Sequence, residues 1–292
     1  MRRNTASFTA EMMALYRAME TSRPPSTRIL TDPYASLFLN RRFRLASWMA
    51  AFAAGERWLY GYMQRRIPGA LASAIARTRY IDDILGRRLN DGARQVILLG
   101  AGFDTRAMRL ATLQTVDVLE IDHPDTARRK KECLIKAAGQ LPANVRYLSA
   151  DLNLQSPTEL IIKWKIDRSV PTVIIWEGVT NYLEQKSVEN CLRLIATFSP
   201  GSSIIFTYVD RGVLDHPAAW YGAERLLADL ERVQEKWTWG FLPDEMPAWL
   251  IKLGLRLVVD KGAAEYREMY LSERKTLLKG YEFYHVAEAV AV

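Results

Sequence analysis

Apolar residues follow two different spacings along this chain, and the change comes near residue 95. In the N-terminal third they recur at helical intervals, as at Phe8, Met12 and Leu15. Asp32 followed by Pro33 is typical of a helix N-terminus, with the carboxylate as N-cap and the proline in the first turn. We therefore predict helices over residues 7–19, from residue 32 onward, and over residues 45–63 and 71–85.

Beyond that point, short apolar runs of β type alternate with helical patterns. We expect strands over residues 96–99, 115–121, 145–149, 171–176 and 203–208, and helices over residues 105–113, 125–138, 157–165 and 185–198. Such alternation is typical of a doubly wound parallel sheet with helices on both faces. Two closing antiparallel strands, over residues 255–259 and 284–289, would complete a seven-stranded, mostly parallel sheet.

The chain is predicted to have two regions. Residues 1–90 are expected to form an N-terminal helical lid region, and residues 91–292 the sheet domain. Residues 210–250 interrupt the alternation and are interpreted as a helical cap insertion, with a helix over 226–237. Four tryptophans of this insertion either pack within a helical subdomain or form an aromatic wall over a substrate pocket: Trp220, Trp237, Trp239 and Trp249.

Composition and charge argue against a nucleic-acid-binding protein. The chain has 292 residues, of which 49% are hydrophobic, so it can bury a large core. Its formal net charge is +7, but the basic residues fall in separate clusters at 41–44, 65–66 and 128–131, with no known nucleic-acid module. This pattern favours a solvated basic face over a nucleic-acid site.

Three sequence features indicate where the protein is located and whether it binds a metal: the cysteines, the histidines and the N-terminus. Cys133 and Cys191 have no metal or redox spacing and fit a reducing cytosol. The three histidines also lack metal-ligand spacing, so no metal is expected. The N-terminus lacks the apolar stretch of a signal peptide, and the longest apolar-rich stretch, residues 45–54, is too short to span a bilayer. We expect a cytoplasmic protein without a nucleic-acid or membrane partner, and its oligomeric state stays open.

The strand predicted at residues 96–99 leads into Gly100-Ala101-Gly102. Glycines let a ligand approach bare backbone, and a strand, a glycine turn and a helix are the usual entrance to a nucleotide site. The dinucleotide fingerprint has a third glycine where this chain has Thr105, and Asp104 would repel a pyrophosphate. The turn therefore favours a cationic or zwitterionic nucleoside, S-adenosylmethionine (SAM), over NAD. We expect the turn residues Gly100, Ala101, Gly102 and Asp104 to contact this cofactor.

Polar residues follow the next strands at the sheet edge where ligands bind. Asp122 lies about twenty residues past the glycines, placed for ribose hydroxyls, although it could simply cap the next helix. Asp151 could accept a hydrogen bond from an adenine amino group while Leu152 packs on the ring, or it is a turn residue. Glu177, followed by Gly178, comes directly after an apolar strand and either faces the SAM sulfonium or is paired structurally.

Other side chains could bind the cofactor or act in catalysis. Arg77 and Arg79 each present a planar fork suited to the methionine carboxylate of SAM, and their spacing does not distinguish them. Tyr182 or His123 could assist a phenolic acceptor as a base, whereas a carboxylate acceptor is already ionised at neutral pH. His123 also borders the cofactor site, and Glu177 is the third candidate catalytic residue.

Six short segments together resemble the leucine carboxyl methyltransferase family, the PPM group. They occur in family order, cover nearly the whole chain and are more specific together than any one alone: TDPYA (31–35), RTRYID (77–82), LGAGFDTR (99–106), EIDHP (120–124), ADL (150–152) and EGV (177–179). The resemblance implies a class I, Rossmann-like methyltransferase fold that uses SAM and releases S-adenosylhomocysteine. The helical lid and the cap insertion would then border the substrate pocket.

The resemblance also implies roles for particular residues. It selects Arg77 over Arg79 as the residue that holds the SAM carboxylate. The turn at Gly100 would pack on the cofactor, and Asp122 would bind its ribose. Asp151 and Leu152 would border adenine, and Glu177 would lie by the methionine part.

The expected function is O-methylation of a carboxyl or hydroxyl group. The chain resembles bacterial small-molecule members of polyketide pathways, so we expect a small, aromatic or polyketide-like acceptor. It shows no match to the peptide-binding region of the phosphatase-modifying members. The alternatives are a carboxyl methyltransferase of a protein or peptide, a nucleic-acid methyltransferase, a nicotinamide oxidoreductase and a non-catalytic SAM-binding protein.

Overall fold

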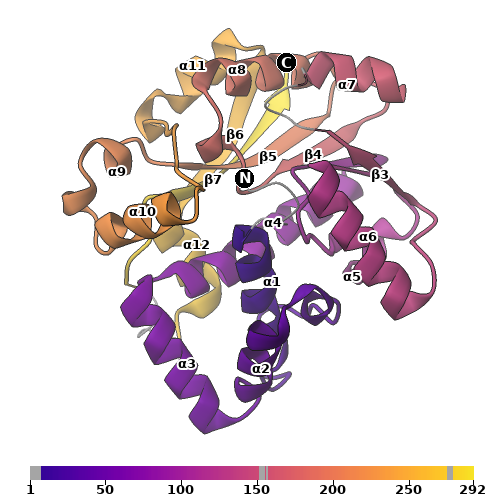
Figure 1. The fold of residues 1–292 in the computed structure, drawn as a ribbon. Coiled ribbons are helices and arrows are strands. Elements are labelled where there is room, and N and C mark those ends of the chain that lie inside the picture. Colours follow the sequence, from indigo (N-terminus) through magenta and orange to yellow (C-terminus); the bar gives the residue numbers. More distant parts are fainter. Residues whose placement is uncertain (1–7, 151–154, 156, 275–278) are drawn as a thin grey trace.

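A seven-stranded sheet forms the centre of the protein, in the order β3-β2-β1-β4-β5-β7-β6 (Figure 1). The computed structural model describes residues 8–150, 155, 157–274 and 279–292. The strands are β1 (Gln95–Leu99), β2 (Asp117–Asp122), β3 (Val145–Ser149), β4 (Thr172–Trp176), β5 (Ser203–Val209), β6 (Leu255–Gly262) and β7 (Tyr284–Ala291). Strand β7 runs antiparallel to its neighbours β5 and β6, and the other neighbouring strands of the described sheet pair in parallel. The predicted seven-stranded, mostly parallel sheet is confirmed.

Helices cover both faces of the sheet, which is why β4 and β5 are buried along their whole length. One face packs against α7 (Pro157–Trp164), α8 (Gln185–Ile195) and α11 (Met246–Lys252). The other packs against α4 (Ala70–Asn90), α6 (Pro124–Ala138) and α12 (Ala263–Leu271). Each face therefore has its own hydrophobic core.

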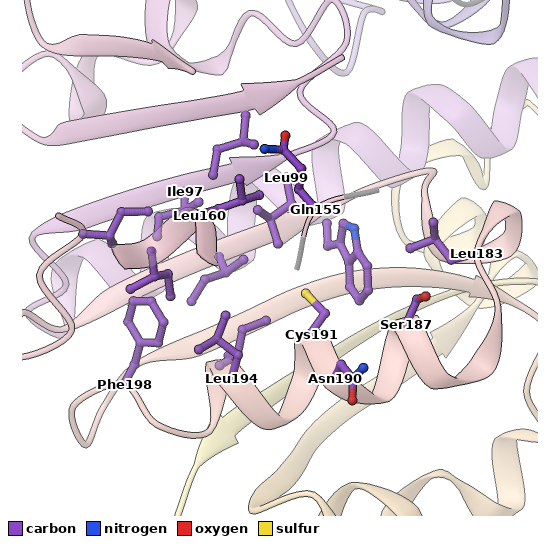
Figure 2. A pocket seen from close by; sticks show the side chains of 16 residues that line it. Ile97, Leu99, Gln155, Leu160, Leu183, Ser187, Asn190, Cys191, Leu194 and Phe198 are labelled. Atoms are coloured by element: carbon purple, nitrogen blue, oxygen red, sulfur yellow. The ribbon is translucent and has the colours of Figure 1, made fainter. Parts of the chain in front are cut away.

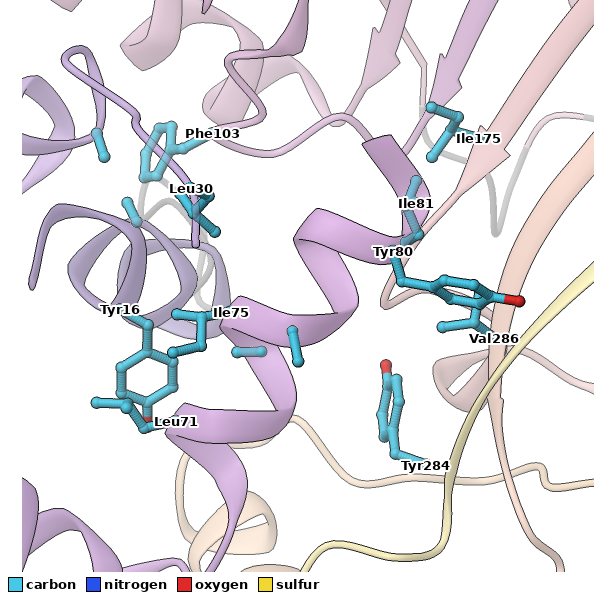
Figure 3. Packing of buried hydrophobic residues seen from close by; sticks show 14 of the residues in the cluster. Tyr16, Leu30, Leu71, Ile75, Tyr80, Ile81, Phe103, Ile175, Tyr284 and Val286 are labelled. Carbon is cyan, nitrogen blue, oxygen red and sulfur yellow. The ribbon is translucent and has the colours of Figure 1, made fainter. Parts of the chain in front are cut away.

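Helix α4 joins the N-terminal helices to the sheet. Its first turns present Leu71 and Ile75 toward Tyr16 of α1 (Phe8–Thr21), while Ile81 lies on the side of the strands (Figure 3). Tyr80 packs near Val286 of β7 in the same cluster. The helical region and the sheet thus share one continuous core, and α4 positions any side chain on its buried face beside the strands.

The predicted helix over residues 45–63 is wrong in one respect: it is two helices, α2 (Arg41–Met49) and α3 (Ala53–Arg66). Phe52 between them has an extended backbone. A Cβ at Gly55 would lie 2.3 Å from the Met49 carbonyl oxygen, so the glycine permits the chain to fold back tightly. Asn40 starts α2 by accepting a hydrogen bond from the Phe43 backbone N–H at 3.0 Å.

The helix predicted from residue 32 is only a 3-10 turn, η1 (Ala35–Phe38). Asp32 does accept hydrogen bonds from the backbone N–H groups of Tyr34 and Ala35, at 3.1 and 3.0 Å. Its other oxygen, Oδ2, accepts from Arg17 Nε at 2.8 Å and from Thr105 Oγ1 at 2.6 Å. The side chain that the sequence predicts as a local helix cap therefore also accepts hydrogen bonds from residues distant in the chain.

The remaining short elements differ in extent from their predictions. The helix expected over 105–113 is split into α5 (Arg106–Arg109) and η2 (Ala111–Leu113), and the one expected over 226–237 is α10 (Ala223–Arg232). The other short helices are η3 (Thr180–Tyr182), α9 (Gly212–Asp215), η4 (Pro217–Ala219) and η5 (Pro243–Glu245). None of the described helices is long and apolar enough to cross a membrane.

The four tryptophans of the 210–250 segment do not form one wall. The rings of Trp220 and Trp237 each lie 6.0 Å from the ring of Phe283. Trp239 and Trp249 instead pack on Phe241, on the opposite face of the sheet. Only the first pair lies on the side of the sheet that carries α4.

Candidate active site

The glycine turn lies at the point where the order of the sheet reverses, since β1 pairs with β2 on one side and β4 on the other. Gly100 and Gly102 have positive φ values of 66° and 49°, which favour glycine. The backbone N–H groups of Gly100 and Ala101 donate to the Ile121 carbonyl, at 2.8 and 3.1 Å. A Cβ at Gly100 would lie 2.4 Å from Val179 Cγ2, so the turn also lets the chain after β4 approach closely.

Asp122, at the end of β2, reaches back to this turn. Its Oδ2 accepts a hydrogen bond from the Gly102 backbone N–H, and its Oδ1 accepts from the His123 N–H at 2.6 Å. Burial raises the pKa of Asp122 despite these two donors. Each carboxylate oxygen keeps acceptor capacity that a ribose hydroxyl could use.

Arg77 and Glu177 meet across the switch point. Arg77, buried on α4, donates from Nε to Glu177 Oε1 at 2.8 Å. Arg106 donates from its Nη2 to Glu177 Oε2 at 3.0 Å. Burial alone would raise the pKa of Glu177, but Arg106 and Arg77 outweigh burial and lower it. Glu177 is therefore an ionised carboxylate held between two cations.

Arg106, which the sequence analysis did not select, is the centre of this network. Its Nε donates to Asp82 Oδ1 at 2.7 Å, and its Nη1 forms an ion pair with Asp104. Arg109 completes the network with two hydrogen bonds to Asp82, at 2.6 and 2.9 Å. Burial would raise the pKa of Asp104, but Arg106 outweighs it and lowers the pKa to about 2.

Asp104 was predicted to contact the cofactor, and in the structure its carboxylate accepts hydrogen bonds from the guanidinium and the backbone N–H of Arg106. A carboxylate two residues before an arginine, at the start of a helix, was the available sequence signal for this pair. Arg77, Glu177, Asp104 and Arg106 thus form one buried ion-pair network beside the glycine turn.

Tyrosine rings pack beside Arg77. The guanidinium carbon of Arg77 lies 4.7 Å from the ring centre of Tyr284, which stacks on Tyr281 at 5.5 Å. Tyr281 has a positive φ of 66°, an unfavourable backbone conformation for a non-glycine residue. Burial raises the pKa of Tyr182, from η3, to about 12 and that of Tyr281 well above its usual range. These phenols remain protonated at neutral pH.

Gly178, His123 and helix α1 complete the surroundings. Gly178 has a positive φ of 72°, and its N–H donates to Thr207 Oγ1 at 2.7 Å. His123 begins α6, where its Nδ1 accepts from the Asp125 N–H at 3.3 Å. Helix α1 lies over the site, because Met13 Sδ is 3.3 Å from Arg77 Nη2.

An apolar cavity of about 230 Å³ lies between the sheet and helices α7 and α8 (Figure 2). Leu99, Ile121 and Trp176, at or near the carboxyl ends of β1, β2 and β4, are among the residues that line it. Trp176 Nε1 is buried and has no hydrogen-bond partner in the described part of the chain. Asp151 and Leu152, which were expected to border adenine, lie outside the described residues.

These groups fit the parts of SAM. The Arg77 fork suits the methionine carboxylate, and Asp122 suits the ribose hydroxyls. The cavity has the apolar walls that a purine ring needs, and the unpartnered indole N–H of Trp176 offers a donor to a ring nitrogen. The glycine turn directly follows Leu99, which lines the cavity, and its glycines let a ligand approach the backbone.

Comparisons with known structures agree with the fold described above. A Thermobifida fusca protein named for methyltransferase activity superposes with a TM-score of 0.59 at 19% identity, over 94% of this chain and 97% of its own. A protein of the duf574 family from Streptomyces avermitilis gives the same TM-score at 15% identity, over 94% and 100% of the two chains. Both likenesses concern the fold, which is that of class I methyltransferases.

The sequence comparisons identify the family to which the chain belongs. A Streptomyces coelicolor protein, SCO7813, named for S-adenosyl-L-methionine-dependent methyltransferase activity, is 30% identical over 83% of this chain and 80% of its own. A similarly named Bacillus subtilis protein, YktD, is 27% identical over 74% and 71%. The model of the leucine carboxyl methyltransferase family matches residues 10–196 of this chain. The chain therefore belongs to the leucine carboxyl methyltransferase family and is a SAM-dependent methyltransferase.

Proposed function

We propose that this enzyme methylates a carboxyl oxygen of a small, apolar acceptor, an aromatic or polyketide-like acid, and so forms a methyl ester. The observation that carries this proposal is the state of the three candidate catalytic residues. Tyr182 is protonated at neutral pH, Glu177 is held by two arginines, and His123 accepts a backbone hydrogen bond as a helix cap. A carboxylate acceptor is compatible with these states because it needs no base.

In this reaction the protein mainly has to align the acceptor with the methyl group and exclude water. Bound SAM supplies an activated methyl group, so that the acceptor O–CH₃ bond forms as the S–CH₃ bond breaks and S-adenosylhomocysteine leaves. Arg77 would hold the donor by its carboxylate, and Asp122 by its ribose. Protonated phenols of Tyr182 and Tyr281 would donate hydrogen bonds to the acceptor carboxylate and orient it. Helix α1 would limit access of water from its side.

A small acceptor fits the closed surroundings of Arg77. Met13 of α1 contacts one side of the guanidinium, and the Tyr284 ring covers another. Trp237 extends the aromatic lining, 6.2 Å from the Tyr284 ring. We also propose that the enzyme acts in the cytoplasm, since Cys133 and Cys191 are both free thiols.

The second candidate is a carboxyl methyltransferase of a protein or peptide. The description of the matched family, which refers to leucine carboxyl groups, favours it. Both candidates make an ester on a carboxylate, so they differ only in the size of the acceptor.

An acceptor screen tests the proposal through S-adenosylhomocysteine release. Aromatic and aliphatic acids, the corresponding phenols, and peptides with C-terminal leucine would be compared. We expect turnover with acids and an alkali-labile methyl ester as product, at a rate nearly constant between about pH 6 and 9 because the acceptor is fully ionised there. Alkali-stable methyl ethers from phenols, with no turnover of acids, would overturn the proposal. Turnover of peptides alone would favour the second candidate.

A further inference from the structure

Helices α2 and α3 form the end of the molecule farthest from the sheet (Figure 1). Residues 41–66, which include both helices, contain six arginines and one acidic residue, Glu56. This segment therefore carries a net charge of +5, out of +7 for the whole chain. Two basic clusters that are separate in the sequence, 41–44 and 65–66, thus belong to one pair of helices.

The charge of this segment is not neutralised within the described structure. Glu56 is engaged in an ion pair with Arg23, and Arg66 pairs with Asp229 at 3.0 Å. The other arginines have exposed side chains: Arg41, Arg42, Arg44, Arg57 and Arg65. The two helices consequently present a strongly cationic surface to solvent.

Large aromatic side chains of the same segment are also exposed. Trp48 and Trp58 are each 61% exposed, and Phe52 and Tyr62 are more than half exposed. Trp48 contacts Phe52 at 5.0 Å between ring centres, and Trp58 stacks on Tyr62 at 5.8 Å. In α3, the residues that pack inward are different ones, Leu59 and Tyr60 among them.

Arginines and apolar side chains follow one another at helical spacing in both helices. In α2, Arg41, Leu45 and Trp48 follow one another at intervals of four and three residues. In α3, Trp58, Tyr62 and Arg65 do the same. We call the surface formed by these exposed arginines and apolar residues of α2 and α3 the cationic aromatic surface.

We propose that the cationic aromatic surface binds the anionic surface of a lipid bilayer, with the two helices lying in the interface. Tryptophan and tyrosine rings favour the level of the lipid headgroups, and arginines attract anionic lipids. Helices of this composition lie on a membrane rather than span it. The sequence alone led us to expect no membrane partner, because it did not show that the two arginine clusters and the aromatic residues share one end of the molecule.

Charge and ring packing disfavour two other occupants. A second copy of the chain would bring one cationic surface against another, which like-charge repulsion opposes. Single-stranded nucleic acid would stack its bases on free aromatic rings, but these rings already pair with each other as Trp48 with Phe52 and Trp58 with Tyr62. Insertion at a bilayer interface leaves both ring pairs intact.

Flotation of the full chain with lipid vesicles tests the proposal. Vesicles of phosphatidylcholine with phosphatidylglycerol would be compared with vesicles of phosphatidylcholine alone. We expect binding only to the anionic vesicles, and a loss of binding as salt is raised. The variant Arg41→Glu/Arg42→Glu should bind at least about tenfold more weakly, and Trp48→Ala/Trp58→Ala should also weaken binding.

Matched changes on the far side of the molecule provide the controls. Lys252→Glu/Arg256→Glu alters two exposed cations, and Ile251→Ala removes an exposed apolar side chain, and both should bind like the unaltered chain. Circular dichroism and SAM binding would show that each variant is folded. The proposal is overturned if folded protein fails to bind anionic vesicles at low salt, if the control variants lose binding equally, or if the surface binds single-stranded RNA or a second copy instead.

Discussion

Arg77 and Glu177 lie a hundred residues apart in the chain, yet Arg77 Nε donates a hydrogen bond to Glu177 Oε1 at 2.8 Å. Arg106 binds the other carboxylate oxygen of Glu177. Because Arg106 supports Glu177 independently, Arg77 can turn part of its fork to a ligand carboxylate without leaving Glu177 unpaired.

Replacement of Arg77 by Met is expected to weaken SAM binding about ten- to hundredfold, the usual loss for one charged hydrogen-bonding partner. Titration calorimetry with SAM measures the effect. Arg79→Met is the matched control, since Arg79 is an exposed neighbour that pairs with Asp83. Equal losses in the two variants would contradict the assignment of Arg77.

Asp122→Asn should weaken SAM binding about tenfold. The amide would replace one carboxylate oxygen with a donor, so it could not accept from Gly102, His123 and ribose together. An analogue of SAM without ribose hydroxyls should show a much smaller difference between variant and unaltered protein. Asp117→Asn, an exposed change at the start of the same strand, serves as the control.

Gly100→Ala should destabilise the protein by about 3 kcal/mol, from positive φ together with the clash against Val179. Gly92 also has a positive φ, but a Cβ there meets nothing within 4 Å, so Gly92→Ala should cost only about 1 kcal/mol. Urea denaturation measures both. The double variant Gly100→Ala/Val179→Ala should recover part of the loss relative to Gly100→Ala, and no recovery would exclude this contact as the cause.

Acid should destabilise the fold through Asp104. Its pKa is about 2 in the folded protein, below the ordinary value of 3.8, so the ion pair contributes stability above about pH 4 that is lost as the pH falls toward 2. The contribution amounts to about 2 kcal/mol. In Arg106→Met this part of the pH dependence should shrink, while stability at pH 7 falls by about 3 kcal/mol or more because three carboxylates lose a partner. Denaturation curves across this pH range would show both effects.

Glu120 and Lys130 form a buried pair at 2.5 Å, and its two halves should respond differently to mutation. Glu120→Gln leaves a buried ammonium without a counter-charge and should cost about 3 kcal/mol. Lys130→Met should cost less, about 1–2 kcal/mol, since burial already raises the pKa of Glu120 to about 7 and the carboxyl can take up a proton. Urea denaturation at neutral pH compares them, and equal costs would contradict this explanation.

Local sequence determined the strands and most long helices, because hydrophobic period and glycine position depend on neighbours in the chain. Apolar runs identified β1 and β4, and Gly100 and Gly102 marked the turn between β1 and α5. Predictions were wrong where a short-range signal was overridden. Residues 45–63 are helical in composition, but the backbone is extended at Phe52, which divides the segment into α2 and α3.

By itself, the sequence determined the fold class and the family, and it indicated Asp122 and Glu177 at the carboxyl edge of the sheet. Only the tertiary structure decided which side chains these residues contact. It brought Arg106 between Asp82, Asp104 and Glu177, placed Tyr281 and Tyr284 beside Arg77, and gathered the arginines of 41–66 at one end of the molecule. The reason is physical: period and motif report on contacts within a few residues, whereas ion pairing and burial depend on segments far apart in the chain.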